Sequence, residues 1–409
     1  MPREGDRLCP RCGQLIPAGQ TACPVCTAPK GFLWSLERET LVLVSMVILA
    51  VFFVITGLAT TRYHAEQKAL GGRWYQRGES ALKANRPEEA VNDFHTALIY
   101  ARDNTAYQMR LADALVKANR LAEAEVYLRT LWERQPGSGQ VNLELARLFA
   151  KSHNPSEAIR YYHAAVFGAW KTNPGAHRLQ VRFELCHFLL NEGEWDAAES
   201  EIIALQTELP RDASLHAEVG GMFVRVGDYR RALEEFQQAV KLNPKQPGAW
   251  AGAGKAAYQL ADYTQARRYL QKAVALDPKN LEAAQKLEVS ELVLELDPFG
   301  VRLPLEERNR RTLAAFRLAL SHLKQCARSR NINLQAKQMT GPFANVYSSV
   351  KKMLPQVNMI TLRRNPDLVN NAMDLVMQME ETAQQVCGTP PAPDQALLLI
   401  SHRRGVTGR

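Results

Sequence analysis

Two consecutive segments decide the fold: ASLHAEVGGMFVRVGDYRRALEEFQQAVKLNPKQ (213–246) and PGAWAGAGKAAYQLADYTQARRYLQKAVALDPKN (247–280). Each has 34 residues, and the two align without a gap. In each, a small residue (Gly220 or Gly254) is followed by an alanine, then by a large side chain and then by another alanine. A period of this length indicates a repeated supersecondary unit rather than one irregular domain.

The same register extends over six segments between residues 71 and 296. The small residue recurs at spacings of 34, 34, 40, 34 and 34, at Gly78, Ala112, Ala146, Cys186, Gly220 and Gly254. The alanine that follows is Ala90, Ala124, Ala158, Ala198, Ala232 or Ala266. The large side chain is Phe94, Leu128, Tyr162, Ile202, Phe236 or Leu270. One helical hairpin cannot bury its apolar face alone, but stacked hairpins can, with small residues where helices approach and large ones filling the gap to the next unit.

This pattern closely resembles the tetratricopeptide repeat (TPR), a pair of antiparallel helices. The resemblance implies an all-α superhelical solenoid of about six repeats over residues 71–296, with 281–296 as the closing helix. Between the paired helices we expect positive φ at four turn residues: Asn85, Asn119, Gly193 and Gly227. Six extra residues around 170–175 should form a surface loop or a lengthened helix.

In TPR domains the first helix of each repeat lines a concave groove, so the resemblance implies a protein-binding face there. Six basic side chains fall in these helices: Lys83, Lys117, Lys151, Arg147, Arg225 and Lys255. Stacked, they would form a basic stripe suited to an acidic peptide or a chain-end carboxylate. The alternative is that a lysine in the last turn of a helix is favoured by the helix dipole alone.

The N-terminal head contains two Cys-x-x-Cys pairs, formed by Cys9 with Cys12 and by Cys23 with Cys26. Two such pairs at this distance resemble a zinc ribbon, in which four thiolates bind one tetrahedral Zn²⁺. The alternatives are a redox dithiol or two disulfides, but a redox dithiol normally needs one pair on a thioredoxin-like unit. We therefore expect a small zinc ribbon over residues 1–30, with a structural zinc that has no open position for catalysis.

Residues 40–61, TLVLVSMVILAVFFVITGLATT, contain no charged side chain. At a rise of about 1.5 Å per residue they give about 33 Å of helix, enough for the ~30 Å hydrocarbon core of a membrane. A cleaved signal peptide fits poorly because its leader would contain the cysteine-rich head. A buried core helix would normally show a polar face, and this segment has none. We predict a single transmembrane helix that contacts lipid here.

Residues 297–409 are basic and resemble no family that we can name. From residue 302 to the end there are 16 Lys+Arg and 7 Asp+Glu, a difference of +9 that equals the net charge of the whole chain. Apolar residues at helical spacing predict a helical domain. Its positive charge suits binding to acidic partners, anionic lipid or nucleic acid. The alternative is that the charge only keeps the protein soluble. We predict a disulfide between Cys326 and Cys387, its only cysteines, if the domain lies outside the cytoplasm.

The cues for membrane orientation conflict. The flank after the apolar segment has more basic residues than the flank before it, which favours a cytoplasmic solenoid. However, the whole head carries five basic residues, and exporting a thiolate zinc site into an oxidising space is unfavourable. We expect the N-terminus in the cytoplasm and the TPR region outside it, in a bacterial inner membrane.

No enzyme signature is present in the sequence, so we expect a non-catalytic, membrane-anchored scaffold or adaptor that binds protein partners through the concave TPR face. The alternative is a membrane-tethered sensor or regulator whose zinc ribbon contacts nucleic acid or signalling machinery, with nucleic acid the less expected partner. A third class is an envelope-assembly enzyme whose catalytic part lies in residues 297–409.

Overall fold

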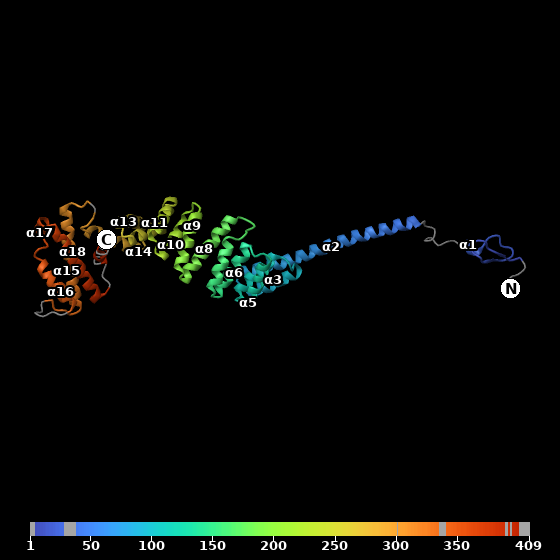
Figure 1. The fold of residues 1–409 in the computed structure, drawn as a ribbon, viewed down its shortest axis with the longest axis horizontal. Coiled ribbons are helices and arrows are strands. Elements are labelled where there is room, and N and C mark those ends of the chain that lie inside the picture. Colours follow the sequence, from blue (N-terminus) through green and yellow to red (C-terminus); the bar gives the residue numbers. More distant parts are fainter. Residues whose placement is uncertain are drawn as a thin grey trace. The chain divides into compact units, whose positions relative to one another are not determined.

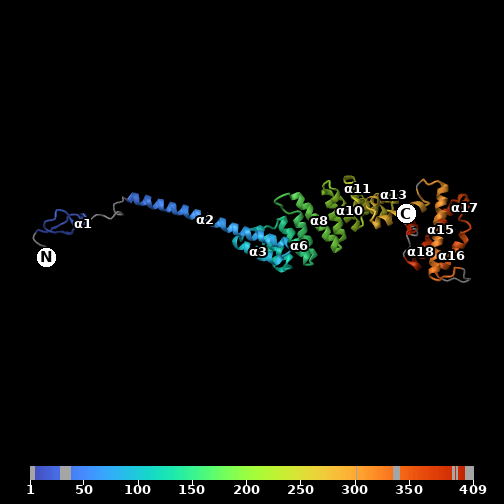
Figure 2. The ribbon, with the colours of Figure 1, turned by 180° about the vertical axis from the view of Figure 1, so that it is seen from behind.

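The computed structural model describes residues 5–27, 38–300, 302–334, 341–388, 392 and 395–400, without the side chains of residues 38 and 39. The chain divides into two compact units, residues 1–128 and residues 129–409. Each is described by itself below, and the ribbon is drawn from two sides in Figures 1 and 2. The division falls inside helix α5 (Leu121–Arg134).

The N-terminal head is a minimal two-stranded unit. Strands β1 (Arg7–Leu8) and β2 (Leu15–Ile16) are antiparallel, with Arg7 opposite Ile16, and are followed by the one-turn helix α1 (Pro24–Thr27). Leu8 and Leu15 are exposed, and among residues 5–27 the buried hydrophobic residues are Cys9 and Cys23. This described part of the head therefore has no apolar core to hold it together, and a ligand shared by the cysteines is the alternative.

Helix α2 (Arg38–Lys83) runs without interruption for 46 residues, from the apolar segment into the repeat region (Figure 1). Residues 40–61 and the region from 71 onward were expected to be separate elements, but the chain between them contains no proline and several strong helix formers. Within the apolar part, the Thr56 hydroxyl donates to the Phe52 carbonyl, so this polar side chain is satisfied inside its own helix. The large apolar side chains between residues 41 and 58 are all exposed in this structure.

In the first unit, the C-terminal part of α2 pairs with α3 (Pro87–Tyr100), which is followed by α4 (Thr105–Lys117) and then α5. The ring of Phe94 on α3 lies directly over Gly78 on α2, where a Cβ atom would come within 2.7 Å of the ring. Phe94 is fully buried. The small and the large position of the repeat pattern therefore pack against each other.

The second unit continues the helical hairpins. Its repeat helices are α6 (Gly139–Lys151), α7 (Pro155–Val166), α8 (Pro174–Glu192), α9 (Trp195–Glu208), α10 (Ala213–Val226), α11 (Tyr229–Leu242), α12 (Pro247–Gln259) and α13 (Tyr263–Leu276). Helix α14 (Leu281–Leu296) follows α13 and packs against it, as expected for a closing helix. The architecture is all-α, as the sequence predicts.

Phe236 on α11 shows how successive hairpins interlock. A Cβ atom on Gly220 of α10 would lie 3.1 Å from the Phe236 ring, and a Cβ atom on Gly252 of α12 would overlap the same ring. The large side chain was expected to fill the gap to the next repeat, and it does so while also covering the small residue of its own repeat. Both glycines are therefore needed for the close approach of helices on each side of one ring.

The turns between paired helices have the predicted left-handed conformation. Asn85, Asn119, Gly193 and Gly227 all have positive φ, from 55° to 86°. His153 and Ala261 occupy the equivalent turns of two other repeats and also have positive φ, at 56° each. These two residues were not predicted. Alanine rarely has positive φ, and histidine has it more often than most residues but still uncommonly, so only the repeat register could have indicated these turns.

The six-residue insertion gives both predicted outcomes, a loop and a longer helix. Helix α8 has 19 residues, and the loop before it forms main-chain hydrogen bonds from Gly139 to the Ala169 carbonyl (2.9 Å) and from Ala169 to the Gly137 carbonyl (2.8 Å). The Trp170 indole lies over Gly139 and donates to the Ala165 carbonyl at 3.1 Å. The insertion is thus held by its own contacts to the preceding repeat.

The remainder of the second unit contains α15 (Leu305–Ser329), α16 (Pro342–Met353), α17 (Met359–Arg364) and α18 (Asp367–Cys387). Helices α15 and α18 form the core of this region and are joined by a disulfide between Cys326 and Cys387, whose Cα atoms are 6.0 Å apart. The Arg311 guanidinium on α15 donates to the carbonyls of Leu294 and Asp297 at the end of α14. This contact satisfies helix-terminal carbonyls and attaches α15 to the closing helix.

Candidate functional site

The four N-terminal cysteines lie together. The sulfur of Cys9 is 3.9 Å from that of Cys26, the sulfur of Cys12 is 3.6 Å from that of Cys23, and all four lie within 4.8 Å of one another. Zinc–thiolate bonds of about 2.3 Å in a tetrahedron place sulfurs about 3.8 Å apart. The cluster therefore fits one tetrahedral metal ion, whereas a disulfide needs an S–S distance of about 2.05 Å.

Local backbone geometry turns each pair of cysteines toward the cluster. The first turn is closed by hydrogen bonds from the Gly13 amide to the Cys9 carbonyl and from the Cys9 amide to the Gln14 carbonyl, both 2.9 Å. Gly13 has a φ of 73°, which a residue with a Cβ rarely adopts. In the second turn, the amides of Cys26 and Thr27 donate to the Cys23 carbonyl.

The environment of Cys9 favours the thiolate form. Main-chain N–H groups of Arg11 and then of Cys12 donate to its sulfur and lower the pKa of the Cys9 thiol from 9.0 to about 7. Thiolates are the form in which cysteine binds metal ions. Four sulfur ligands on one metal ion complete a tetrahedron, so this site can hold a metal structurally but leaves no position for a substrate.

The six basic residues predicted for the groove all lie on the first helix of their repeat, but several are paired with acidic groups. Lys117 Nζ is 3.1 Å from Asp113 Oδ2, and Lys255 Nζ is 3.1 Å from Glu282 Oε1. The Arg147 guanidinium makes two hydrogen bonds to Glu184, at 2.9 and 2.5 Å. These three cations are therefore already engaged by acidic side chains.

The other three groove residues differ among themselves. Arg225 on α10 donates to the main-chain carbonyl of Leu190 and to the Asn191 side chain, at 3.0 and 3.1 Å, so it links two successive first helices. Lys83 and Lys151 lie exposed in the last turn of α2 and α6, where the helix dipole favours a cation.

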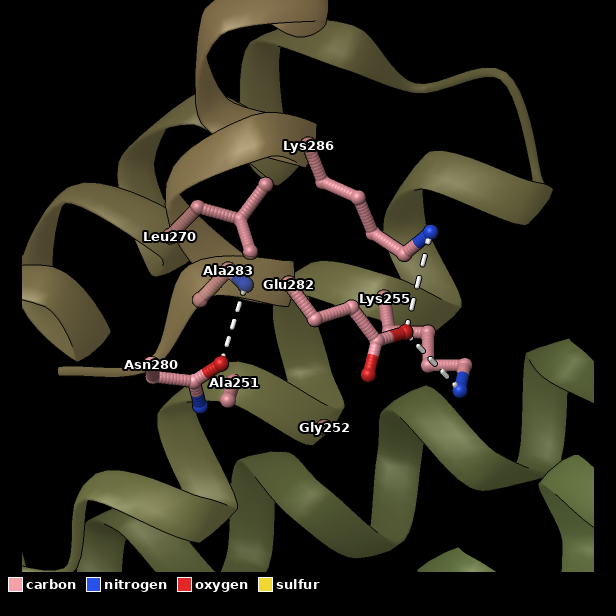
Figure 3. A pocket seen from close by; sticks show the side chains of 8 residues that line it. All are labelled: Ala251, Gly252, Lys255, Leu270, Asn280, Glu282, Ala283 and Lys286. Carbon is pink, nitrogen blue, oxygen red and sulfur yellow. Dashed lines mark hydrogen bonds and ion pairs between the residues drawn. The ribbon is translucent and has the colours of Figure 1, made fainter.

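One pocket of about 140 Å³ opens beside Lys255, between α12, α13 and α14. Figure 3 shows that the Lys255 and Lys286 side chains both approach the Glu282 carboxylate, while Leu270, Ala283 and Ala251 form the opposite wall. The lining residues are Ala251, Gly252, Lys255, Leu270, Asn280, Glu282, Ala283 and Lys286.

Sequence reasoning identified Lys255 but missed Glu282, Lys286 and Asn280. These three belong to the closing helix α14 or its N-cap, for which the repeat pattern makes no prediction. A signal was available in the spacing: Glu282 and Lys286 are four residues apart and therefore lie on one face of a helix.

Comparison with known proteins identifies the repeats. Tetratricopeptide-repeat family models match residues 81–148 and 223–280. The chain therefore contains TPR repeats and has an all-α TPR fold, and TPR repeats are a protein-binding architecture.

Similar solved structures include the TPR protein YrrB, described with an unusual peptide-binding site (16% identity, covering 47% of this chain and 95% of that one, TM-score 0.38). Another is the C-terminal part of a TPR repeat-containing protein from Cytophaga hutchinsonii (16%, 58% and 92%, TM-score 0.42). A third is PilW, a widely conserved type IV pilus biogenesis factor (16%, 53% and 98%, TM-score 0.39). No curated protein sequence matches the chain.

Proposed function

We propose that this TPR-containing chain is a membrane-anchored, non-catalytic scaffold, which binds protein partners through the first helices of its repeats. The observation that carries the proposal is helix α2, in which an exposed apolar segment and the first helix of the first repeat are one continuous element. None of the most apolar window of this helix is buried against the rest of the protein. A core helix of a soluble protein would be covered, whereas a helix in lipid needs no protein cover.

Tethering explains why a binding module without catalytic groups is useful at a membrane. Attachment to a surface raises the effective concentration of partners that reside there, so that weak contacts over several repeats become sufficient. The repeats supply a wide, regular face for this purpose. Residues 297–409 extend this assembly in the proposal and contribute no chemistry to it.

In the same proposal, Zn²⁺ is the ion held by Cys9, Cys12, Cys23 and Cys26. Sulfur ligands alone and near-tetrahedral spacing favour zinc among common metal ions. Its part is to fold the head, because the described head has almost no apolar core.

The chemistry of the two cysteine groups supports opposite locations for the two ends of the chain. Thiolate metal sites persist in a reducing compartment, whereas disulfides such as Cys326–Cys387 form in an oxidising one. The proposed arrangement is a cytoplasmic head, a span over residues 40–61 and repeats outside the cytoplasm. In this proposal the membrane is a bacterial inner membrane.

Site-specific photocrosslinking in native membranes tests the scaffold function. A photoreactive amino acid at Gln259, an exposed residue one turn after Lys255 on the first helix α12 of its repeat, should yield discrete crosslinked products that sediment with the membrane. The same amino acid at Lys272, an exposed position on the second helix α13, is the matched control and should yield few. Release of the chain by alkaline carbonate, or equal crosslinking from both positions, contradicts the proposal.

Orientation is tested by thiol labelling in intact cells. After mild reduction, a membrane-impermeant maleimide should label Cys326 and Cys387 but none of the four head cysteines. A Cys326→Ser/Cys387→Ser variant provides the background signal. Labelling of the head cysteines with sparing of the late pair would reverse the proposed topology.

A further inference from the structure

We infer that the pocket between α12, α13 and α14 is a carboxylate-binding site of the scaffold, and that Glu282 occupies it as an internal substitute for the ligand. The ligand is an acidic side chain or a chain-end carboxylate of a partner protein. This inference rests on the proposed function, because a protein partner must present the carboxylate.

Two lysines from different helices converge on one carboxylate oxygen. Lys255 on α12 and Lys286 on α14 place their Nζ atoms 3.1 and 3.7 Å from Glu282 Oε1 (Figure 3). Their ion pairs and hydrogen bonds lower the pKa of the Glu282 carboxyl, with the hydrogen bond from Lys255 as the main cause. The three groups together carry one net positive charge, so an incoming carboxylate that replaces Glu282 finds two cations already in place.

Lys286 is held in position better than Glu282 is. The Lys286 ammonium lies 5.1 Å from the centroid of the Tyr258 ring, and its side chain is 24% exposed. Glu282 is 61% exposed and lies in the first turn of α14. Ion pairs of exposed side chains stabilise weakly, because solvent competes and two flexible chains are immobilised. Glu282 can therefore leave the lysines at little cost.

The rest of the pocket suits a short acidic side chain on a peptide. Its volume of about 140 Å³ accommodates one side chain and is smaller than the pockets that bind drug-sized molecules. Leu270, Ala283 and Ala251 supply an apolar wall for a methylene stem. At the other end lies Asn280, whose side-chain oxygen accepts from the Ala283 amide at 3.0 Å. Its amide nitrogen makes no hydrogen bond within the described residues and is a donor for a peptide carbonyl.

A simpler explanation is that Glu282 only complements the helix dipole and forms an incidental surface ion pair. The two explanations differ in what removal of the Glu282 charge does. An incidental pair predicts no effect on ligand binding beyond that of any other lost negative charge. A substitute for the ligand predicts tighter binding, because the competitor for both lysines is gone.

The test is fluorescence anisotropy with the full-length chain in nanodiscs of zwitterionic lipid. Three pentapeptides labelled with a neutral BODIPY dye are compared: Gly-Ala-Glu-Ala-Gly with an amidated end, Gly-Ala-Ala-Ala-Gly with a free carboxylate, and the latter amidated as a probe without charge. We expect one or both charged probes to bind more tightly than the uncharged probe. The charged probe that binds shows whether the site takes a glutamate side chain or a chain-end carboxylate. Glu282→Gln should tighten binding of the charged probe about two- to fivefold, the range expected for losing an exposed ion-pair competitor.

Matched variants separate this site from general electrostatics. Glu291→Gln removes an exposed negative charge from the same helix and should leave affinity unchanged. Lys255→Gln should weaken binding at least tenfold, as expected for losing a hydrogen bond to a charged group, whereas Lys272→Gln on α13 should not.

Equal effects of Glu282→Gln and Glu291→Gln, no effect of Lys255→Gln, or no binding of either charged probe to wild type and Glu282→Gln would each overturn the inference. Crosslinking of partners from α12 in that situation would leave the scaffold function intact and remove only this pocket as its carboxylate site.

Discussion

Truncating Phe236 to alanine tests the stacking of the repeats most directly. The Phe236 side chain is 6% exposed, and its ring covers Gly220 of its own repeat and Gly252 of the next. Neither of these two glycines has a side chain that could move into the space that the ring leaves. Replacements of buried phenylalanine by alanine cost about 3–5 kcal/mol.

Repeat arrays unfold in segments, so the loss should be measured locally. A cost of about 3–5 kcal/mol corresponds to an increase of about two to three and a half orders of magnitude in the opening equilibrium. Amide hydrogen exchange of the full-length chain in nanodiscs, read by mass spectrometry, should show this increase in peptides from α10, α11 and α12. Peptides from α15 and α18 should change far less.

The matched control is Phe167→Ala, which removes the same side chain from a position that is 75% exposed. Its expected cost is within about 0.5 kcal/mol. A second check uses size exchange: Gly252→Ala should destabilise through overlap with the Phe236 ring, and Phe236→Leu in the same chain should relieve part of that cost. If Phe236→Ala behaved like Phe167→Ala, the interlocking of neighbouring hairpins through this ring would be wrong.

Three further predictions follow from other parts of the chain. Chelation of the metal should unfold the head. The expected result is loss of about one zinc per chain together with rapid hydrogen exchange at residues 5–27, while the repeats stay protected. Unchanged exchange would show that no metal holds the head. Replacing Cys326 and Cys387 by serine should destabilise α15 and α18 by about 2–4 kcal/mol, given the 61-residue separation, and an unchanged thermal midpoint would contradict this. Arg310, and after it Arg311, lowers the pKa of the Glu307 carboxyl from 4.5 to about 2. Because the folded-state pKa is the lower one, its stabilising contribution is complete above about pH 4.5 and is lost as pH falls toward 2. Glu307→Gln should therefore destabilise the protein at pH 7 but have little effect near pH 2, and an equal effect at both values would be inconsistent with this pKa.

Features with a repeat period could be predicted from the sequence. The packing of Phe236 against Gly220 could be predicted because both positions recur at 34-residue steps. Positive φ could be predicted at those turns between paired helices that contain asparagine or glycine. His153 and Ala261 show the limit of residue preference, because the stacked hairpins impose a positive φ on residues that rarely adopt it alone.

Pairings between repeats were harder to predict than the repeats themselves. Arg147 and Lys255 were expected as available cations, but each has an acidic partner on a later helix. Glu184 lies on α8, 37 positions further along the chain, and Glu282 lies on the closing helix α14, 27 positions further along. Neither acid belongs to the repeat pattern, so periodicity gives no indication of them. The four head cysteines were easier, because both Cys-x-x-Cys pairs are local and their spacing alone indicates a shared ligand.

Because α2 is continuous, the direction in which the first repeat points around the axis of α2 depends on the number of residues between the apolar segment and the repeat. Each residue added between positions 62 and 70 would rotate everything beyond it by about 100° around the helix axis and advance it by about 1.5 Å. One added residue would thus turn α3 to a different side of the apolar segment, whereas seven would restore its direction to within about 20°. The length of this short stretch, rather than the identity of its side chains, therefore sets the direction in which the first hairpin presents itself.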